Sequence, residues 1–122
     1  MPDPAAQFVA AGLGSLPHLA DARPVAAGVA ATQRAVAMAE VTGAPIYIVH
    51  LSSERALRVT EEAQARGVPV YVETRPMYLH LTQEVYQRPD AGLYLGGPPL
   101  REKWDQDMLW AGIANGIIHT IG

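Results

Sequence analysis

His50 is the residue whose type and position in this sequence point most directly to chemistry. It lies near the end of an apolar, β-branched and aromatic run at 45–51, Pro-Ile-Tyr-Ile-Val-His-Leu. A neutral imidazole is the commonest metal ligand in proteins, and a strand end holds such a ligand rigidly. His50 is therefore predicted to bind a metal ion. Its position alone leaves open the alternative of a half-buried histidine that bonds to a carbonyl group.

The second apolar run, 68–74, also ends in polar residues. Glu73 could serve as an acid, a base or a metal ligand, or it could pair with Arg75 nearby in the sequence. Ser52 and Ser53 could touch a substrate, but helix capping explains them as well. The other three histidines are expected in loops or in a packed strand, without a chemical role: His18, His80 and His119.

Alternating helices and strands are predicted to position these residues. The Gly- and Pro-rich segment 1–24 is expected to be irregular, and Gly43, Gly67 and Gly116 are expected to end helices. The predicted elements are helices at 25–42, 54–66 and 102–115, strands at 45–51, 68–74 and 117–121, and a less regular stretch at 75–100 with a short helix near 82–86. This order indicates an α/β fold with about three parallel strands. Ligands of such folds bind at the carboxyl ends of the strands.

Composition excludes several classes of function. The net charge is −3 and no basic cluster is present, which disfavours nucleic-acid binding. No apolar run approaches the ~20 residues that span a bilayer, so no membrane partner is expected. The chain has no cysteine, so a metal site must use His, Asp, Glu or a modified Lys. This is compatible with a reducing cytoplasm, where we expect the protein.

Three segments together resemble the cyclic amidohydrolases. They are Tyr47-Ile-Val-His-Leu-Ser-Ser53, Glu73-Thr-Arg-Pro-Met-Tyr-Leu79 and Pro98-Pro-Leu-Arg-Glu-Lys-Trp104. The third segment, continuing to Trp110, looks especially like dihydropyrimidinases and hydantoinases. The order and spacing of all three match, and the resemblance covers about residues 17–122.

The resemblance implies a TIM-like (β/α)8 barrel, of which residues 1–122 would be a C-terminal-side portion, because a whole barrel needs about 250 residues. It implies two divalent metal ions, usually zinc, bridged by a carboxylated lysine and a hydroxide that opens a cyclic amide or imide. His50 matches the family's last histidine ligand. Gly97 stands where the family has a serine that contacts the substrate ring largely through its backbone. The remaining ligands would lie upstream of Met1 or just past Gly122, so no catalytic residue is assigned within the chain.

Two other hypotheses are open. An allantoinase- or dihydroorotase-type hydrolase has the same fold, although the run 101–104, Arg-Glu-Lys-Trp, favours the hydantoinase group. A catalytically silent truncated or interaction domain is the second.

In the complete enzyme we expect a homo-oligomer. The isolated chain is expected to lack hydantoinase activity, because one ligand cannot hold a catalytic metal, and to be marginally stable or to oligomerise through its exposed sheet edges.

Overall fold

The computed structural model describes residues 3–122 apart from the side chain of Phe8. Twelve short elements follow one another along this part of the chain: α1 (Pro4–Ala10), η1 (Leu16–His18), α2 (Leu19–Ala22), α3 (Val25–Thr42), β1 (Ile46–Ile48), α4 (Glu54–Ala65), β2 (Val70–Thr74), α5 (Pro76–His80), η2 (Gln83–Gln87), η3 (Ala91–Tyr94), α6 (Lys103–Ala114) and β3 (Thr120–Ile121). None of the helices in residues 3–122 is both long enough and apolar enough to cross a bilayer.

The N-terminal segment differs from the irregular stretch that its glycines and prolines predicted. Residues 4–10 and 19–22 are helical. Pro4 occupies the first turn of α1, where its missing N–H costs nothing, and Asp3 caps the helix by accepting a hydrogen bond from Ala5 N at 3.0 Å. Pro24 precedes the first turn of α3. Prolines and glycines here mark the helix ends and do not prevent helices.

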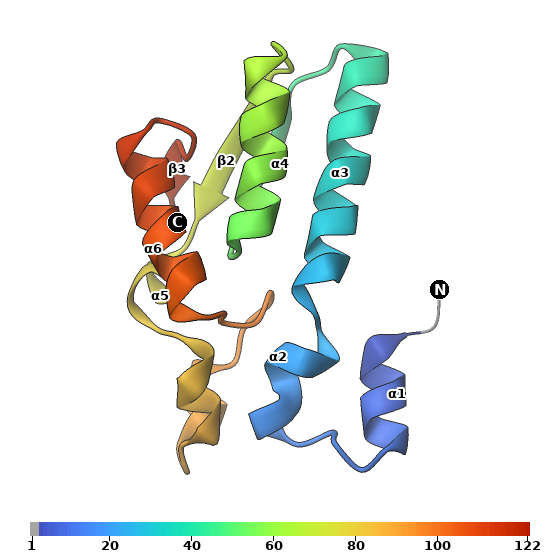
Figure 1. The fold of residues 1–122 in the computed structure, drawn as a ribbon, viewed down its shortest axis with the longest axis vertical. Helices are drawn as coiled ribbons and strands as arrows, with labels where there is room; N and C mark the ends of the chain where they lie inside the picture. Colours follow the sequence, from blue (N-terminus) through green and yellow to red (C-terminus); the bar gives the residue numbers. More distant parts are fainter. Residues whose placement is uncertain (1–2) are drawn as a thin grey trace.

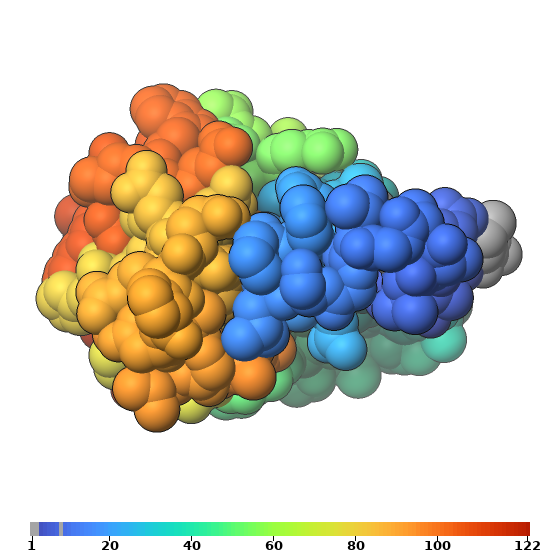
Figure 2. Space-filling view, turned by 90° about the horizontal axis from the view of Figure 1, so that it is seen from below, coloured from blue at the N-terminus to red at the C-terminus, as the bar shows by residue number. Residues whose placement is uncertain are grey.

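The N-terminal segment packs beside the segment that follows β2. In Figure 2 the blue part of the chain that contains η1 and α2 lies against residues 75–100 in yellow and orange, whereas α1 lies farther away. Gln87 donates a hydrogen bond to the carbonyl of Pro17 at 3.2 Å, and Arg101 donates one to the carbonyl of Ala20 at 3.1 Å. These long-range contacts join η1 and α2, which lies below α3 in Figure 1, to the later part of the chain.

The sheet confirms the predicted α/β class with three parallel strands. Its strand order is β1-β2-β3, with Ile46 opposite Val70 and Glu73 opposite Thr120. The three main helices, α3, α4 and α6, were predicted within one residue at each end, and Gly43 ends α3 in the left-handed conformation at φ 70°. The strands are shorter than predicted, since β3 pairs over only two residues.

One face of the sheet is covered and the other is open. The helices α3, α4 and α6 lie on the same side of the strands (Figure 1), and Val70 and Val72 are buried beneath them. On the opposite face Tyr47 and Tyr71 are each 51% exposed and Val49 is 48% exposed. Apolar residues at successive positions predicted strands buried on both faces. Within residues 3–122 only the helical face has its cover.

Gly112 lets α6 approach the rest of the core. A Cβ atom at this position would lie 3.0 and 3.2 Å from the two Cδ atoms of Leu57 and 3.2 Å from Cδ1 of Ile118. The backbone of Gly112 also accepts hydrogen bonds from Ile117 N and Ile118 N, at 2.9 and 3.1 Å. The missing side chain therefore allows α6 to lie against both α4 and the segment that leads into β3.

Replacing Gly112 with alanine is expected to destabilise the chain by about 1–3 kcal/mol, because the added methyl group overpacks the core. Gly28 in α3 is the matched control, since a Cβ there meets nothing within 4 Å. Gly28→Ala should stabilise the chain by up to about 1 kcal/mol through helix propensity alone. Urea unfolding followed by circular dichroism measures both variants, and equal effects of the same sign would contradict this account of the α4–α6 contact.

Candidate metal centre

His50 lies just beyond β1, where the chain turns toward α4. Its φ angle is 59°, the one positive value found for a non-glycine residue within the described part of the chain. Left-handed backbone is sparsely populated by residues with a side chain, although histidine is among the types enriched there. Such a conformation persists only when its surroundings hold it, and it is commonest at functional sites.

The His50 ring faces the carboxyl end of β2. Its Nδ1 atom lies 3.3 Å from Oε1 of Glu73. The alignment of this pair does not meet hydrogen-bond geometry, so Nδ1 is buried without a hydrogen-bond partner among residues 3–122. Glu73 therefore contacts His50, whereas the sequence suggested a pair with Arg75. The His50 side chain remains 41% exposed, so the accessible part of the ring is the side that carries Nε2.

Backbone hydrogen bonds fix the two strand ends relative to each other. Leu51 N donates to the carbonyl of Glu73 at 2.9 Å, and the buried Thr74 hydroxyl donates to the carbonyl of Leu51 at 2.7 Å. Gly122 N donates to the carbonyl of Thr74 at 3.1 Å, which brings the end of β3 to the same edge. The ends of the three strands therefore lie together at one edge of the sheet, next to His50, Thr74 and Gly122.

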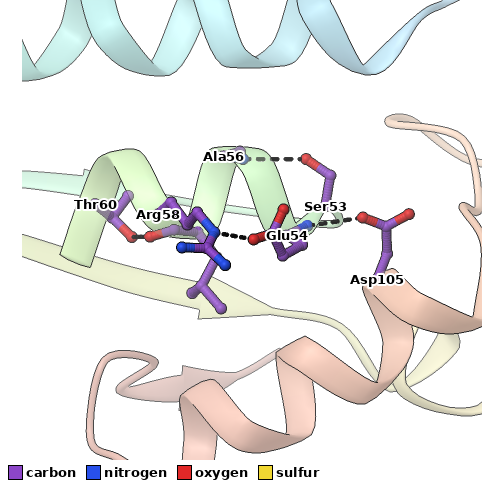
Figure 3. Close-up of polar contacts among 7 residues, drawn as sticks. Ser53, Glu54, Ala56, Arg58, Thr60 and Asp105 are labelled. Atoms are coloured by element: carbon purple, nitrogen blue, oxygen red, sulfur yellow. Dashed lines mark hydrogen bonds and ion pairs between the residues drawn. The ribbon is translucent and has the colours of Figure 1, made fainter. Parts of the chain in front are cut away.

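The loop that carries His50 is also held at the start of α4. The Ser53 hydroxyl accepts a hydrogen bond from Ala56 N at 3.3 Å, as predicted for a capping residue. Asp105 of α6 accepts a second one from Glu54 N at 2.8 Å, and Glu54 pairs with Arg58 one turn further along (Figure 3). The sequence did not single out Asp105. Its position three residues after Glu102 at the start of a helix was the available signal, since this spacing is typical of a capping box.

A cavity of about 310 Å³ opens beside His50. Its lining includes His50, Ser52, Ser53 and Arg101, together with residues of α3 and β1. Ser52 and Ser53 are themselves buried. The cavity therefore has room for a small molecule or an ion next to His50.

Gly97 lines a neighbouring cavity of about 430 Å³. Pro98 and Arg101 line both cavities, so Gly97 lies next to the space around His50 and not directly within it. A Cβ atom on Gly97 would meet one atom within 4 Å, the Arg23 Nη1 at 4.0 Å. The backbone at this position is thus accessible to a ligand, and substrate contact by Gly97 stays a prediction.

Arg101 is a buried cation between these cavities. Burial lowers the pKa of its guanidinium, and Asp105 opposes this shift. Nη1 donates to the carbonyl of Ala20, while Nε has no hydrogen-bond partner among residues 3–122. The Arg101 carbonyl accepts a hydrogen bond from Gln83 N at 2.8 Å. Arg101 thus joins the N-terminal segment, the loop after Gly97 and the segment at η2.

Two buried tyrosines support the loop that contains Gly97. Tyr86 accepts a hydrogen bond from Leu100 N at 2.8 Å, and Tyr78 donates one to the carbonyl of Pro98 at 2.8 Å. Burial raises the pKa of both hydroxyls, that of Tyr78 to about 12. Tyr78 belongs to α5, a helix that the sequence analysis missed although Pro76 after an extended residue is a common helix start.

Tyr86→Phe is expected to cost about 1–3 kcal/mol, because Leu100 N–H would be left buried without a partner. Tyr94→Phe is a suitable control, since Tyr94 is only half-buried. Thermal unfolding of the two variants compares them directly. A Tyr86→Phe chain as stable as the wild type would show that Leu100 N–H finds another acceptor.

The other histidines do not join this site. His119 precedes β3 and is exposed, so its predicted place in a packed strand is wrong, although its Nδ1 accepts a hydrogen bond from Val72 N at 3.1 Å. His80 is exposed and lies edge-on to Trp110. Within residues 3–122, no three His, Asp or Glu side chains are grouped so that they could hold a metal ion. His50 is thus one potential ligand, accompanied by Glu73.

The chain is similar in sequence to D-hydantoinases. No protein-family model matches the chain. It is 42% identical over 117 residues to the D-hydantoinase of Ralstonia pickettii, an alignment that covers 94% of this chain and 26% of the relative.

Solved structures agree with the sequence match. The chain superposes with a TM-score of 0.93 on the D-hydantoinase of Bacillus sp. AR9, at 38% identity, and with 0.94 on the dihydropyrimidinase of Brevibacillus agri NCHU1002, at 40% identity. Each match covers 98% of this chain and 26% of the solved chain. The resemblance predicted from three short motifs is therefore confirmed over nearly the whole chain. In sequence and fold, this chain is homologous to a segment that makes up about one quarter of each hydantoinase or dihydropyrimidinase.

Proposed function

We propose that this chain forms part of a hydrolase that opens cyclic amides or imides, either hydantoins or dihydropyrimidines. The observation that carries the proposal is the 42% identity to a D-hydantoinase over 117 residues. The chain spans only about a quarter of the relatives that it matches, so the activity belongs to a complete protein in which further strands would close a (β/α)8 barrel.

His50 would supply one ligand to a pair of divalent metal ions, with zinc as the expected metal. The residues present fit this role, because Nδ1 is buried while the side chain is 41% exposed, which leaves the Nε2 side of the ring accessible, and His50 is among the residues that line the cavity. When bound, the metal supplies a Lewis acid for the ring carbonyl and lowers the pKa of water. The other ligands would come from outside residues 3–122, in which no complete ligand group occurs.

The loop around Gly97 would hold the substrate ring. Its backbone is open to the cavity next to His50, and peptide N–H and C=O groups match the donors and acceptors of a cyclic amide. Gly97 offers no hydroxyl, so any recognition at this position relies on the backbone. Ser53 lines the cavity but its hydroxyl caps α4, and we assign neither it nor the neighbouring Ser52 a contact with substrate.

We further propose that the complete enzyme is a homo-oligomer and acts in the cytoplasm. Within residues 3–122 the sheet has one exposed face, and its edge strands β1 and β3 each pair on one side only. Further strands of the complete enzyme or a second subunit would cover these surfaces. The absence of cysteine is compatible with a reducing compartment. Cyclic amides are small neutral molecules, and the net charge of −3 gives no electrostatic reason to expect a nucleic-acid partner.

A chimaeric enzyme tests the proposed function. The chain would replace the homologous 117-residue segment of the Ralstonia pickettii D-hydantoinase, and its hydrolysis of hydantoin, dihydrouracil, allantoin and dihydroorotate would be compared. We expect hydantoin or dihydrouracil to be opened most efficiently, and the isolated chain to turn over none of them. Preference for allantoin or dihydroorotate would favour the related hydrolases. A folded, metal-loaded but inactive chimaera would indicate a catalytically silent domain.

A further inference from the structure

Glu73 has no role in the function proposed so far, yet its carboxylate is buried at the end of β2 with only 9% of its side chain exposed. A buried carboxylate is costly unless a partner compensates for its lost hydration. Within residues 3–122, Oε1 of Glu73 lies 3.3 Å from Nδ1 of His50. Its partner is thus the same ring that is predicted to bind a metal.

The two nitrogen atoms of His50 have different surroundings. Nδ1 is buried, without a hydrogen bond among residues 3–122, while the ring as a whole remains 41% exposed. The accessible nitrogen is therefore Nε2, and the nitrogen beside Glu73 is Nδ1. Histidines that bind a metal through one ring nitrogen generally donate the N–H of the other to a carboxylate, a carbonyl or water, which fixes the tautomer and the ring orientation.

The backbone holds the two side chains at this distance. Leu51, which follows His50, donates its N–H to the carbonyl of Glu73, and Thr74, which follows Glu73, donates its hydroxyl to the carbonyl of Leu51. Neither residue can move along its strand without breaking these bonds. Because Nδ1 and Oε1 are 3.3 Å apart, a change in the orientation of the His50 ring can direct Nδ1–H at Oε1.

We propose that Glu73 is a positioning residue: it accepts a hydrogen bond from Nδ1–H of His50 and so holds the ring in the tautomer whose Nε2 lone pair is free for the metal. This inference rests on the proposed function, because it assigns the orientation of the same ligand. Glu73 itself stays outside the metal's ligand set. The arrangement also explains why a strongly acidic side chain occupies a buried position at the strand end.

Gly122 provides an independent way to disturb the pair. A Cβ atom at this position would lie 2.8 Å from Oε1 and 3.3 Å from Cδ of Glu73. Gly122→Ala therefore pushes the carboxylate away from its present position without changing either partner. If Glu73 positions His50, this variant should show a weaker form of the defect caused by Glu73→Ala.

The first measurement is the tautomer of His50, read from the ¹⁵N chemical shifts of the ring in the metal-free 122-residue chain at a pH where the ring is neutral. We expect the Nδ1–H form in the wild type and in Glu73→Gln, whose amide oxygen is still an acceptor. Glu73→Ala should shift the ring toward Nε2–H. Glu84→Ala, which removes an exposed carboxylate, should change nothing.

The second measurement is zinc affinity in the chimaeric enzyme, determined by competition with a chelator. Glu73→Ala should weaken binding by roughly 10–100-fold, the usual effect of losing such a partner, and Glu73→Gln should restore most of it. Wild-type affinity and tautomer in Glu73→Ala would overturn the inference. If Glu73→Gln lost as much zinc affinity as His50→Ala, the inference would also be overturned, because Glu73 would then be a metal ligand itself. Unchanged zinc affinity in His50→Ala would instead refute the proposed role of His50 as a metal ligand, on which this inference rests.

Discussion

Replacing His50 with alanine in the chimaeric enzyme is expected to reduce hydantoin hydrolysis by roughly 10³-fold. The ring lies at the end of β1 with Nδ1 buried, the rest of the side chain is partly exposed, and His50 lines the cavity; alanine offers no ligand in its place. Polarisation of a carbonyl by a metal contributes several kcal/mol to the transition state. A loss of about 4 kcal/mol corresponds to roughly three powers of ten in rate.

His80→Ala is the matched control for this prediction. His80 is an exposed histidine that contacts Trp110 and does not line the cavity beside His50, so its removal should leave kcat/KM within a few-fold of the parent. Metal content measured by atomic absorption separates loss of the ion from loss of the fold. If His50→Ala retains both its zinc and its activity, the strand-end histidine is not a ligand.

Leu109→Ala is expected to lower the free energy of unfolding by about 2–5 kcal/mol. Leu109 lies on α6, has no exposed surface and belongs to the core between the helices and the sheet. Truncation removes the favourable burial of its side chain and leaves a cavity that the surrounding side chains fill only in part. In a chain with one uncovered sheet face, such a loss is a large share of a total stability on the order of 5–15 kcal/mol.

Leu93→Ala supplies the comparison, because Leu93 is 81% exposed. Its truncation should change stability by less than about 0.5 kcal/mol. Urea unfolding curves of the two variants give the difference in free energy, provided that the slopes agree with that of the wild type. Equal effects of the two leucine substitutions would mean that α6 does not pack on the core as described.

The sequence by itself determined the order and type of most elements, because their signals are local. The helix α3 begins and ends where its composition and Gly43 predict, and α4 and α6 agree within one residue at each end. Glycines at 67 and 116 adopt the positive φ angles that end α4 and α6. The apolar runs likewise predicted three parallel strands, and the strand-end rule selected His50 without knowledge of its surroundings.

Tertiary structure decided everything that depends on residues distant in the chain. The partner of Glu73 is His50 and not its sequence neighbour Arg75, because parallel pairing brings the ends of β1 and β2 together. Asp105 and Arg101 join segments that are 51 and 81 residues apart. Propensity and periodicity act over a few residues, whereas ring orientation, burial of a carboxylate and the shape of a cavity arise only when strands and helices pack.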